Sequence, residues 1–461
     1  MSQEKAVKPF GMADKIGYAF GDFGNDFTFI LSSMMLMKFY TDVMGVSAGL
    51  VGLMMMLARF VDAVTDVTMG QIVDRSKPTP IGKFKPWIRR MMGPVAVASF
   101  LMYASWFANM SMGFKIFWMF FTYILWGSVC YTGVNIPYGS MASAISAEPK
   151  DRQSLSTWRS IGASLAGMVI GVVLPMVVYY TDAAGNTMLD GTKMTIAAAG
   201  CSIGAVVCYI LCTTLTTERV KVEQKTDKFS FKVLVDLLIQ NRSLYGIVLA
   251  ALCLLLATLS LSGMTSYIFA NYFKSAASMS LCSIVGVIVT LACSTFVTPL
   301  AMKFGKKELS MVGSVIAVAA FLAAFFMHTS NVNLFILFYA VAYLGQAFFS
   351  LTCWAMITDV IDDVEVKTGD RSDGTVYAIY SFARKCGQAL SSGLTGLLLT
   401  MIGYSAATQN DQSVIDGIYN ITCLAPMIGF ILVIIVLFFV YPLDKKAVEA
   451  NAAALAAKRN K

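Results

Sequence analysis

Twelve long apolar stretches run through the chain, and this pattern limits the fold more than any other feature of the sequence. Crossing the hydrocarbon core of a bilayer takes about 20 apolar residues in an α-helix. In lipid, a helix is the open-chain structure that satisfies all of its own backbone polar groups. We therefore predict an all-α integral membrane protein with twelve transmembrane helices, at 15–41, 47–73, 88–107, 113–146, 153–180, 193–215, 242–270, 278–303, 309–328, 333–358, 375–404 and 414–441.

The composition points to the same surroundings. Of the 461 residues, 57% are hydrophobic and 13% are charged, whereas a soluble domain carries about 25% charged residues. Such a chain has too few polar side chains to cover a surface that faces water. No polar tract is long enough for a separate soluble domain, so the lipid bilayer is the expected partner of the whole chain.

The distribution of Lys and Arg predicts the orientation. Basic residues gather after the second, sixth and eighth predicted helices and at both termini, which places these parts in the cytoplasm by the positive-inside rule. The same loops account for the net charge of +8, so no nucleic-acid partner is needed. The N-terminal segment has no removable signal peptide pattern. We expect a multi-pass protein of a bacterial inner membrane, with both termini cytoplasmic. The loop residues are Arg75, Lys77, Lys83, Lys85, Arg89, Arg90, Arg219, Lys221, Lys225, Lys228, Lys232, Lys303, Lys306 and Lys307.

A polar segment at 216–241 divides six predicted helices from six. We predict an N-terminal six-helix half at 1–215, a cytoplasmic linker at 216–241, and a C-terminal half with a short cytoplasmic tail at 242–461. In transporters built from two related halves, the substrate binds near the midplane between them.

Cysteine and histidine offer no metal-ligand pattern. The ten cysteines are scattered through apolar stretches, and His328 is the one histidine of the sequence. We interpret the cysteines as small buried hydrophobic side chains. We expect no cofactor, and any proton coupling would have to use carboxylates.

Ionisable residues inside the predicted helices are the most informative ones. At the centre of a span each costs about 2.5–3.5 kcal/mol on insertion scales, so such residues usually serve a function. They are Asp22 and Asp26 in the first helix, Arg59, Asp62 and Asp66 in the second, Arg159 in the fifth, and Arg384 and Lys385 in the eleventh.

Asp62 and Asp66 are four residues apart and project from one helical face, with Arg59 on the same side. Two close carboxylates repel each other in a low dielectric unless a cation lies between them or one is protonated. We predict a site for the coupling ion, Na⁺ or H⁺, with the hydroxyls of Thr65 and Thr132 as further ligands. The alternative is that Arg59 neutralises one carboxylate in an inert pair.

Asp26, Arg159 and Lys385 are predicted to bind the substrate. A carboxylate accepts hydrogen bonds from sugar hydroxyls, and Arg or Lys can hold an anion. The alternative is a buried salt-bridge network that only gates the bundle. Aromatic side chains that could stack on sugar rings, but more often pack or anchor a helix, are Trp158, Trp354, Tyr377 and Tyr380.

An acidic run from Asp359 to Asp373 follows the tenth predicted helix. We interpret it as a solvated cytoplasmic loop. Pairing of this run with the basic loop after the second helix, at an inner gate, is a further hypothesis.

Six motifs occur in order along essentially the whole chain. They are GYAFGDFGNDF (17–27), FYTDVMGVSAGLVG (39–52), ARFVDAVTDVTMGQIVDR (58–75), GKFKPW (82–87), VNIPYGSM (134–141) and RSDGTVYAIYSFARKCGQA (371–389). Together they resemble the glycoside–pentoside–hexuronide:cation symporter family, which belongs to the major facilitator superfamily and whose best-known member is melibiose permease.

The resemblance implies roles for individual positions. It implies cation ligands at Asp62, Thr65, Asp66 and Thr132, and sugar ligands at Asp26, Arg159, Trp354 and Lys385. Melibiose permease differs at four positions, with aspartate at Asn135, tryptophan at Gly139, asparagine at Thr65 and lysine at Asn25. We also predict that Asn135 and Tyr377 bind the substrate. These departures argue against an α-galactoside, and the NIPYG and SFARKCGQA segments resemble those of carriers of β-glucuronides and related glycosides.

We therefore expect a secondary active symporter, and not an enzyme, which imports a glycoside or glycosyl acid by alternating access and works as a monomer. A sugar sensor built on a transporter scaffold would carry a signalling domain, and the sequence contains no such domain. A membrane enzyme would need a nucleophile or metal motif, and an exporter of drugs or lipids would prefer an apolar cavity.

Overall fold

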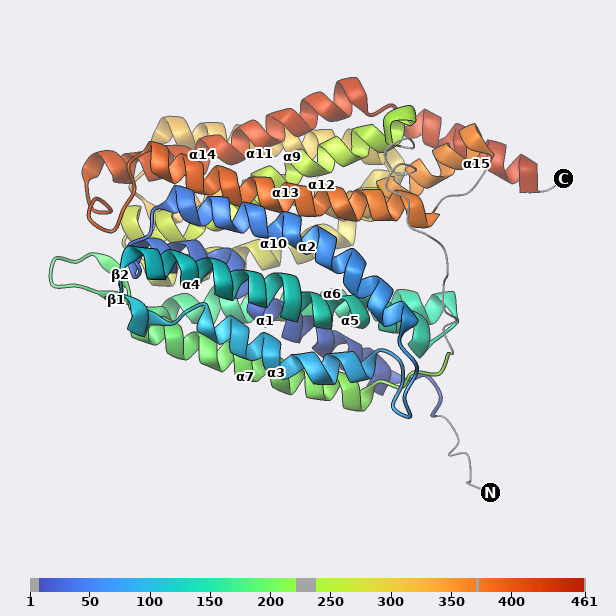
Figure 1. The fold of residues 1–461 in the computed structure, drawn as a ribbon. Helices are drawn as coiled ribbons and strands as arrows, with labels where there is room; N and C mark the ends of the chain where they lie inside the picture. The colour runs from blue at the N-terminus through green and yellow to red at the C-terminus, as the bar shows by residue number, and fades with distance from the viewer. Residues whose placement is uncertain (1–7, 221–237, 370–372, 460–461) are drawn as a thin grey trace. The chain divides into compact units, whose positions relative to one another are not determined.

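The computed structural model describes residues 8–220, 238–369 and 373–459 (Figure 1). The chain divides into two compact units. The first, called the N-unit, comprises Met1–Asp227 with Ser405–Ala407, and the second, the C-unit, comprises Lys228–Tyr404 with Thr408–Lys461. Most of the predicted linker at 216–241 lies outside the described residues, so the assignment of halves and linker stays a prediction.

The N-unit is a helical bundle with one small hairpin. A single span is formed by α4, the π-helical turn η2 and α5, and the hairpin of β1 and β2 projects from the bundle between α6 and α7 (Figure 1). The elements are α1 (Met12–Asp42), α2 (Ala48–Arg75), α3 (Lys85–Leu101), η1 (Ser105–Phe107), α4 (Met112–Ile124), η2 (Leu125–Tyr131), α5 (Thr132–Ile145), α6 (Pro149–Val178), β1 (Tyr179–Thr181), β2 (Thr187–Leu189) and α7 (Gly191–Leu215).

The C-unit is helical throughout its described part. Its spans α9 and α14 each continue into a π-helical turn, η3 and η4, and a last helix, α15, follows the final span. The elements are α9 (Arg242–Tyr267), η3 (Ile268–Tyr272), α10 (Ala276–Phe304), α11 (Lys306–Met327), α12 (Val332–Thr368), α13 (Asp373–Met401), α14 (Gln412–Ile435), η4 (Val436–Val440) and α15 (Lys445–Arg459).

The prediction of twelve transmembrane helices is confirmed by twelve long helical segments in the described part of the chain. Nine of them are long and apolar enough to cross a membrane by composition alone. The other three are α1 and α13, which carry predicted site residues, and α3, which has only 17 residues. The spans that carry Arg59, Asp62, Asp66 and Arg159 are among the nine.

Three local features differ from the sequence-based expectation. The sequence predicts neither the hairpin between α6 and α7 nor the helix α15 in the C-terminal tail. The acidic run was wrongly interpreted as a loop, because α12 continues to Thr368 and ends at Gly369, whose φ of +84° suits glycine. Asp370 and Arg371 lie outside the described residues.

Part of the acidic run is buried and bonded rather than solvated. The Asp363 carboxylate accepts hydrogen bonds from Ser243 of α9 at 2.5 Å, from Lys367 at 2.6 Å and from Asn451 of α15 at 3.1 Å. Asp359 pairs with Lys306 at 2.6 Å. These contacts join α12 to α9, α11 and α15 within the C-unit.

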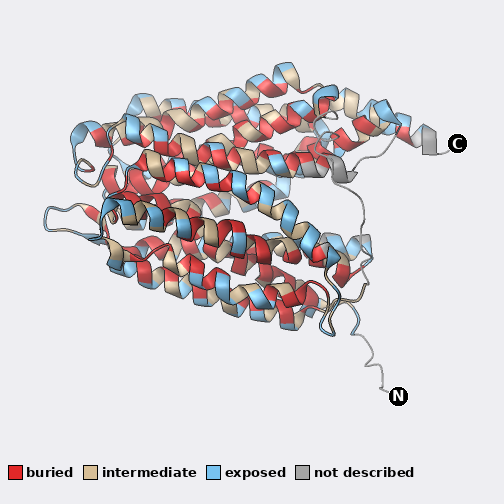
Figure 2. Cartoon of the chain, in the orientation of Figure 1, coloured by how far each residue is buried: buried red, intermediate tan, exposed pale blue. Residues whose placement is uncertain are grey.

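The exteriors of both bundles are apolar. Figure 2 shows exposed residues along the outer faces of the helices, and many of these are large hydrophobic side chains, such as Val64, Ile203, Met302 and Phe326. In water such surfaces would be unfavourable, whereas lipid tails solvate them without cost. The helices therefore bury small and polar residues inside and present aliphatic side chains outward.

In the N-unit, α1 packs against α6 and α7, α3 against α7, and α2 against η2 and α5. The approach of α6 to α1 is close at Gly162, where an added Cβ atom would lie 2.1 Å from the carbonyl oxygen of Ala19. Only glycine permits this approach, which brings polar side chains of the two helices within hydrogen-bonding distance.

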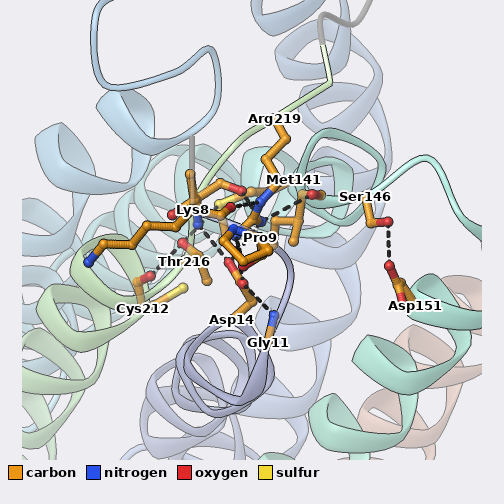
Figure 3. A network of polar contacts seen from close by, with 12 residues as sticks. Lys8, Pro9, Gly11, Asp14, Met141, Ser146, Asp151, Cys212, Thr216 and Arg219 are labelled. Atoms are coloured by element: carbon orange, nitrogen blue, oxygen red, sulfur yellow. Dashed lines mark hydrogen bonds and ion pairs between the residues drawn. The ribbon is translucent and has the colours of Figure 1, made fainter. Parts of the chain in front are cut away.

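A network of polar contacts links the segment around Arg219 to α1 and α5 in the N-unit (Figure 3). The Arg219 guanidinium pairs with Asp14 of α1 at 2.8 Å and also donates to the carbonyls of Lys8, Pro9 and Ile145. The Asp14 carboxylate accepts a further bond from the amide of Thr217 at 2.9 Å. These bonds tie the segment after α7 to the start of α1 and the end of α5.

Candidate functional site

Two groups of charged side chains lie inside the N-unit. The α2 cluster comprises Arg59, Asp62 and Asp66 of α2 with the hydroxyls that bind them, and the α1 cluster comprises Asp22 and Asp26 of α1 with Arg159 of α6. Both contain two aspartates four residues apart, which places the two carboxylates on one face of each helix.

In the α2 cluster, Asp62 is buried and has two partners. Its Oδ2 atom accepts a hydrogen bond from Nη1 of Arg59 at 3.2 Å, and its Oδ1 atom accepts one from the hydroxyl of Ser128 at 2.6 Å. The Arg59 guanidinium also lies 5.1 Å from the ring centroid of Phe29 on α1. Arg59 thus neutralises Asp62, as the alternative interpretation of this pair expected.

The second carboxylate of the α2 cluster meets a neutral partner. Oδ1 of Asp66 accepts a hydrogen bond from the hydroxyl of Thr132 at 2.7 Å. Thr132 is the first residue of α5 and follows the π-helical turn η2, which carries Ser128. Such turns are frequent at functional sites. Here the turn and the residue after it present two hydroxyls to two carboxylates of α2.

The structure does not join Thr65 to this cluster. Its hydroxyl donates to the backbone carbonyls of Val61 and Asp62, both at 3.2 Å. This back-bonding to the own helix is common for threonine in helices. Its predicted role as a cation ligand stays a prediction.

The ligand chemistry of the α2 cluster is that of a small hard cation. Four oxygen-bearing side chains meet there, Asp62, Asp66, Ser128 and Thr132. Carboxylate and hydroxyl oxygens suit hard cations, and a carboxylate can equally take up a proton. The chemistry of these oxygen atoms is compatible with Na⁺ or H⁺.

In the α1 cluster, Arg159 reaches across to α1. Its Nε atom donates to Oδ1 of Asp22 at 3.0 Å, and the side chain of Asp22 is 10% exposed while that of Arg159 is 42% exposed. Asp26 lies within electrostatic reach of both. The sequence predicted Asp26 and Arg159 but did not assign the carboxylate that Arg159 pairs with.

Two stacked aromatic rings lie beside this ion pair. The rings of Tyr18 and Tyr138 are stacked at 4.6 Å, and the hydroxyl of Tyr138 donates to the carbonyl of Tyr18 at 2.7 Å. The guanidinium of Arg159 lies 5.5 Å from the centroid of the Tyr138 ring. The stacked rings leave Arg159 little freedom on the side that faces α5.

Asn135 belongs to a chain of polar contacts beside Asp26. The side-chain Nδ2 of Asn25 donates to Oδ1 of Asn135 at 3.4 Å, and Oδ1 of Asn25 accepts a hydrogen bond from the Tyr209 hydroxyl at 2.9 Å. These contacts connect α5, α1 and α7. Asn135 lies one helical turn after Thr132 on α5, so one short helix contacts both clusters.

The C-unit holds the other predicted substrate ligands. The indole of Trp354 on α12 is 43% exposed, contacts the ring of Tyr380 at 5.1 Å, and has the Arg384 guanidinium 5.5 Å from its centroid. Lys385, the next residue on α13, is half-buried. The side chain of Tyr377 lies outside the described residues. Arg384 is therefore the basic residue seen to stack on the predicted sugar platform.

Ser128, Asp22 and Arg384 are polar site residues that the sequence did not assign. Ser128 precedes Thr132 by four residues and Asp22 precedes Asp26 by four, so helical spacing was a usable signal for both. The choice between Arg384 and Lys385 depends on the rotation of α13, which spacing does not give.

Among the described residues, no cluster of three or more His, Cys, Asp or Glu side chains is close enough to hold a metal. All ten cysteines are free thiols, and most are buried among apolar side chains.

The sequence matches the family model described as "MFS/sugar transport protein" over residues 17–445. It is 31% identical over 439 residues to the "Glucuronide carrier protein homolog" of Escherichia coli (strain K12), covering 94% of this chain and 93% of that protein. It is 30% identical to the "Isoprimeverose transporter" of Lactiplantibacillus pentosus, covering 94% of this chain and 89% of the relative.

A solved structure shares the fold. The crystal structure of a D-xylose–proton symporter aligns with a TM-score of 0.66 at 12% identity, covering 93% of this chain and 97% of that chain. This likeness supports the twelve-helix architecture.

Proposed function

The chain belongs to the MFS/sugar transport protein family, and from this membership we propose that it is a secondary active symporter that imports a glycoside or glycosyl acid together with H⁺ or Na⁺. The coarser part follows directly from the family: the protein is a multi-pass sugar transporter of a bacterial inner membrane and not an enzyme. The sugar, the coupling ion and the direction of transport belong to the proposal.

The α2 cluster is the observation that carries the proposal. Two carboxylates inside a span are expensive in lipid, yet each is bonded to a hydroxyl of the neighbouring α4–η2–α5 span, at 2.6 and 2.7 Å. The oxygen atoms of Asp66 and Thr132 lie together at 2.7 Å on two neighbouring spans, where a small cation could bind both.

The coupling between ion and sugar would pass through α5. Thr132 contacts the α2 cluster, and Asn135, three residues later, contacts Asn25 beside Asp26. A cation bound at Asp62 and Asp66 would fix the position of Thr132 and therefore of Asn135. By linkage, the cation and the sugar must then raise each other's affinity by the same factor.

The substrate class follows from the α1 cluster and from the relatives. Carboxylate and guanidinium groups suit sugar hydroxyls and acidic groups, and the relatives are named for glucuronide and isoprimeverose. We propose a β-glucuronide, a pentoside or a related sugar, bound by Asp26, Asn135 and Arg159. Trp354, Tyr377 and Lys385 are proposed as further ligands from the C-unit.

Both termini are proposed to be cytoplasmic because of the basic loops, and a single chain is proposed to suffice for transport. Alternating access would expose the bound ion and sugar to one side of the membrane at a time.

Uptake of a radiolabelled β-glucuronide into reconstituted vesicles tests the proposal. An inward Na⁺ gradient and an inward H⁺ gradient are imposed separately, with Asp62→Asn as the control. Concentrative uptake under one of the gradients, lost in the variant, is expected. If glucuronides, pentosides and other glycosides all fail under both gradients, the protein is a sensor or another kind of transporter, and symport is excluded.

A further inference from the structure

The ion pair of Asp22 and Arg159 joins α1 to α6, and symport through the α2 cluster gives Asp22 no role. We propose that this pair is a proton-linked anion switch, in which the acidic group of a glycosyl acid takes Arg159 while Asp22 takes up a proton from solution. The inference rests on the proposed sugar symport and narrows its substrate class to anionic sugars.

A second ion pair, formed within α1 itself, is more deeply buried. Lys38 and Asp42 lie 2.8 Å apart, with side chains 1% and 5% exposed. Arg159, in contrast, is held at one edge and is 42% exposed. The side chain of Arg159 is therefore accessible to a ligand, whereas Lys38 is enclosed.

The geometry leaves the donors of Arg159 available. Asp22 occupies the Nε atom, and the Nη1 and Nη2 amino groups make no hydrogen bond within the described parts of the chain. A guanidinium binds a carboxylate best through two parallel N–H bonds. The stacked rings of Tyr138 and Tyr18 lie against one side of the head and limit its movement.

The charges of the cluster give a reason for a proton to accompany an anionic ligand. With both carboxylates ionised, Asp22, Asp26 and one guanidinium give the α1 cluster one net negative charge. A sugar carboxylate would add a second negative charge inside the bundle, where like charges repel strongly. Protonation of Asp22 removes that charge and releases Arg159 to the ligand.

The groups around Asp22 are compatible with this role. Its electrostatic neighbours on packed elements are Arg159 of α6, Tyr138 of α5, Tyr131 of η2 and Cys212 of α7, with Tyr18 and Asp26 on α1 itself. Phenols and thiols are uncharged below about pH 8 and arginine is always charged. The carboxylates are therefore the members of this set whose protonation can change the charge of the cluster.

Proton uptake on binding is the direct test. The purified full-length protein in lipid nanodiscs is titrated in weakly buffered solution with 4-nitrophenyl β-D-glucuronide, and in parallel with the matched neutral 4-nitrophenyl β-D-glucoside. We expect about one proton to be taken up per glucuronide bound near pH 7.5 and none per glucoside. The glucuronide affinity should rise as the pH falls, by at most about tenfold per pH unit for one linked proton.

The Asp22→Asn variant mimics the protonated carboxyl group. The switch predicts that this variant binds the glucuronide more tightly, whereas a loss of structure would weaken binding. We expect this variant to bind the glucuronide at least about tenfold more tightly than the wild type at pH 8, with no proton uptake and no pH dependence. Asp42→Asn removes the carboxylate of the buried Lys38–Asp42 pair. This control variant should keep the proton uptake, the pH dependence and the preference between the two probes of the wild type.

Several results would overturn the switch. They are glucuronide binding without proton uptake in the wild type, equal weakening of both probes by Asp22→Asn, or no binding of the glucuronide by the wild type. These measurements are made at equilibrium, without gradients. A failure of gradient-driven uptake would thus contradict symport, whereas a failure here would contradict the switch.

Discussion

The two carboxylate clusters of the N-unit share one pattern, two aspartates four residues apart on a helix, but they are held in different ways. In the α2 cluster, buried Asp62 and half-buried Asp66 are bonded to hydroxyls of one neighbouring span at 2.6 and 2.7 Å. In the α1 cluster, Asp22 is bonded to a guanidinium whose side chain is 42% exposed. Asp62 also has a guanidinium partner, Arg59, but that side chain is 10% exposed. Hydroxyl ligands beside carboxylates suit a bare cation, whereas an exposed guanidinium suits a larger ligand with its own charge. This difference supports the proposal that the ion binds in one cluster and the sugar in the other.

The largest effect is expected from Asp62→Asn. It removes a carboxylate of the proposed ion site and leaves Arg59 without its partner, and an unpaired buried charge costs several kcal/mol. Gradient-driven sugar uptake into vesicles should fall to the level of protein-free vesicles. Asp42→Asn, which also removes a buried paired carboxylate, should retain uptake. Equal loss in both variants would mean that the effect is one of folding.

Loss of a hydroxyl from the α2 cluster should have a smaller effect. Ser128→Ala and Thr132→Val each remove a hydrogen bond to a carboxylate, worth about 1.5–3 kcal/mol. The cation concentration that half-saturates sugar uptake should rise roughly tenfold to a hundredfold, and Thr132→Ser should stay near the wild type. An unchanged cation dependence in both variants would remove these hydroxyls from the ion site.

Arg159→Lys should separate the clusters. Lysine has no planar fork and cannot bind Asp22 through one edge while presenting two amino groups to a ligand. Sugar affinity should fall roughly tenfold, while cation binding to the sugar-free protein, followed by calorimetry, should stay unchanged. A loss of cation binding as well would show that the two clusters form one site.

The smallest effect is expected from Thr65→Val. The Thr65 hydroxyl bonds to the carbonyls of its own helix at 3.2 Å, so its removal should change cation half-saturation less than about twofold, as surface-type substitutions do. A change as large as that of Thr132→Val would restore Thr65 as an ion ligand, as its sequence motif implies.

The twelve spans were predictable because hydropathy and length decide whether a helix crosses lipid. The same logic failed at the end of α12. Charged residues from Asp359 to Lys367 suggested a loop, but a helix can continue beyond the hydrocarbon, and here it buries Asp363 against Ser243. Gly369 then ends the helix with a positive φ.

The residues of the candidate site were easier to predict from the sequence than the hydrogen bonds and ion pairs between them. Spacing placed Asp62 and Asp66 on one face, but the sequence did not show that Arg159 bonds to Asp22 while Asp26 stays at longer range. That choice depends on the close approach of α6 to α1 at Gly162. A contact between helices that are distant in sequence needs coordinates, and Ser128 of the η2 turn is a second example.

The reciprocity of ion and sugar binding tests the central claim most directly. The affinity of the purified protein for the sugar is measured with and without saturating cation, and the affinity for the cation with and without saturating sugar. Symport through the α2 cluster predicts that both affinities rise by the same factor, and that this factor falls sharply in Asp62→Asn. Sugar affinity that is insensitive to Na⁺ and to pH in the wild type would contradict the account.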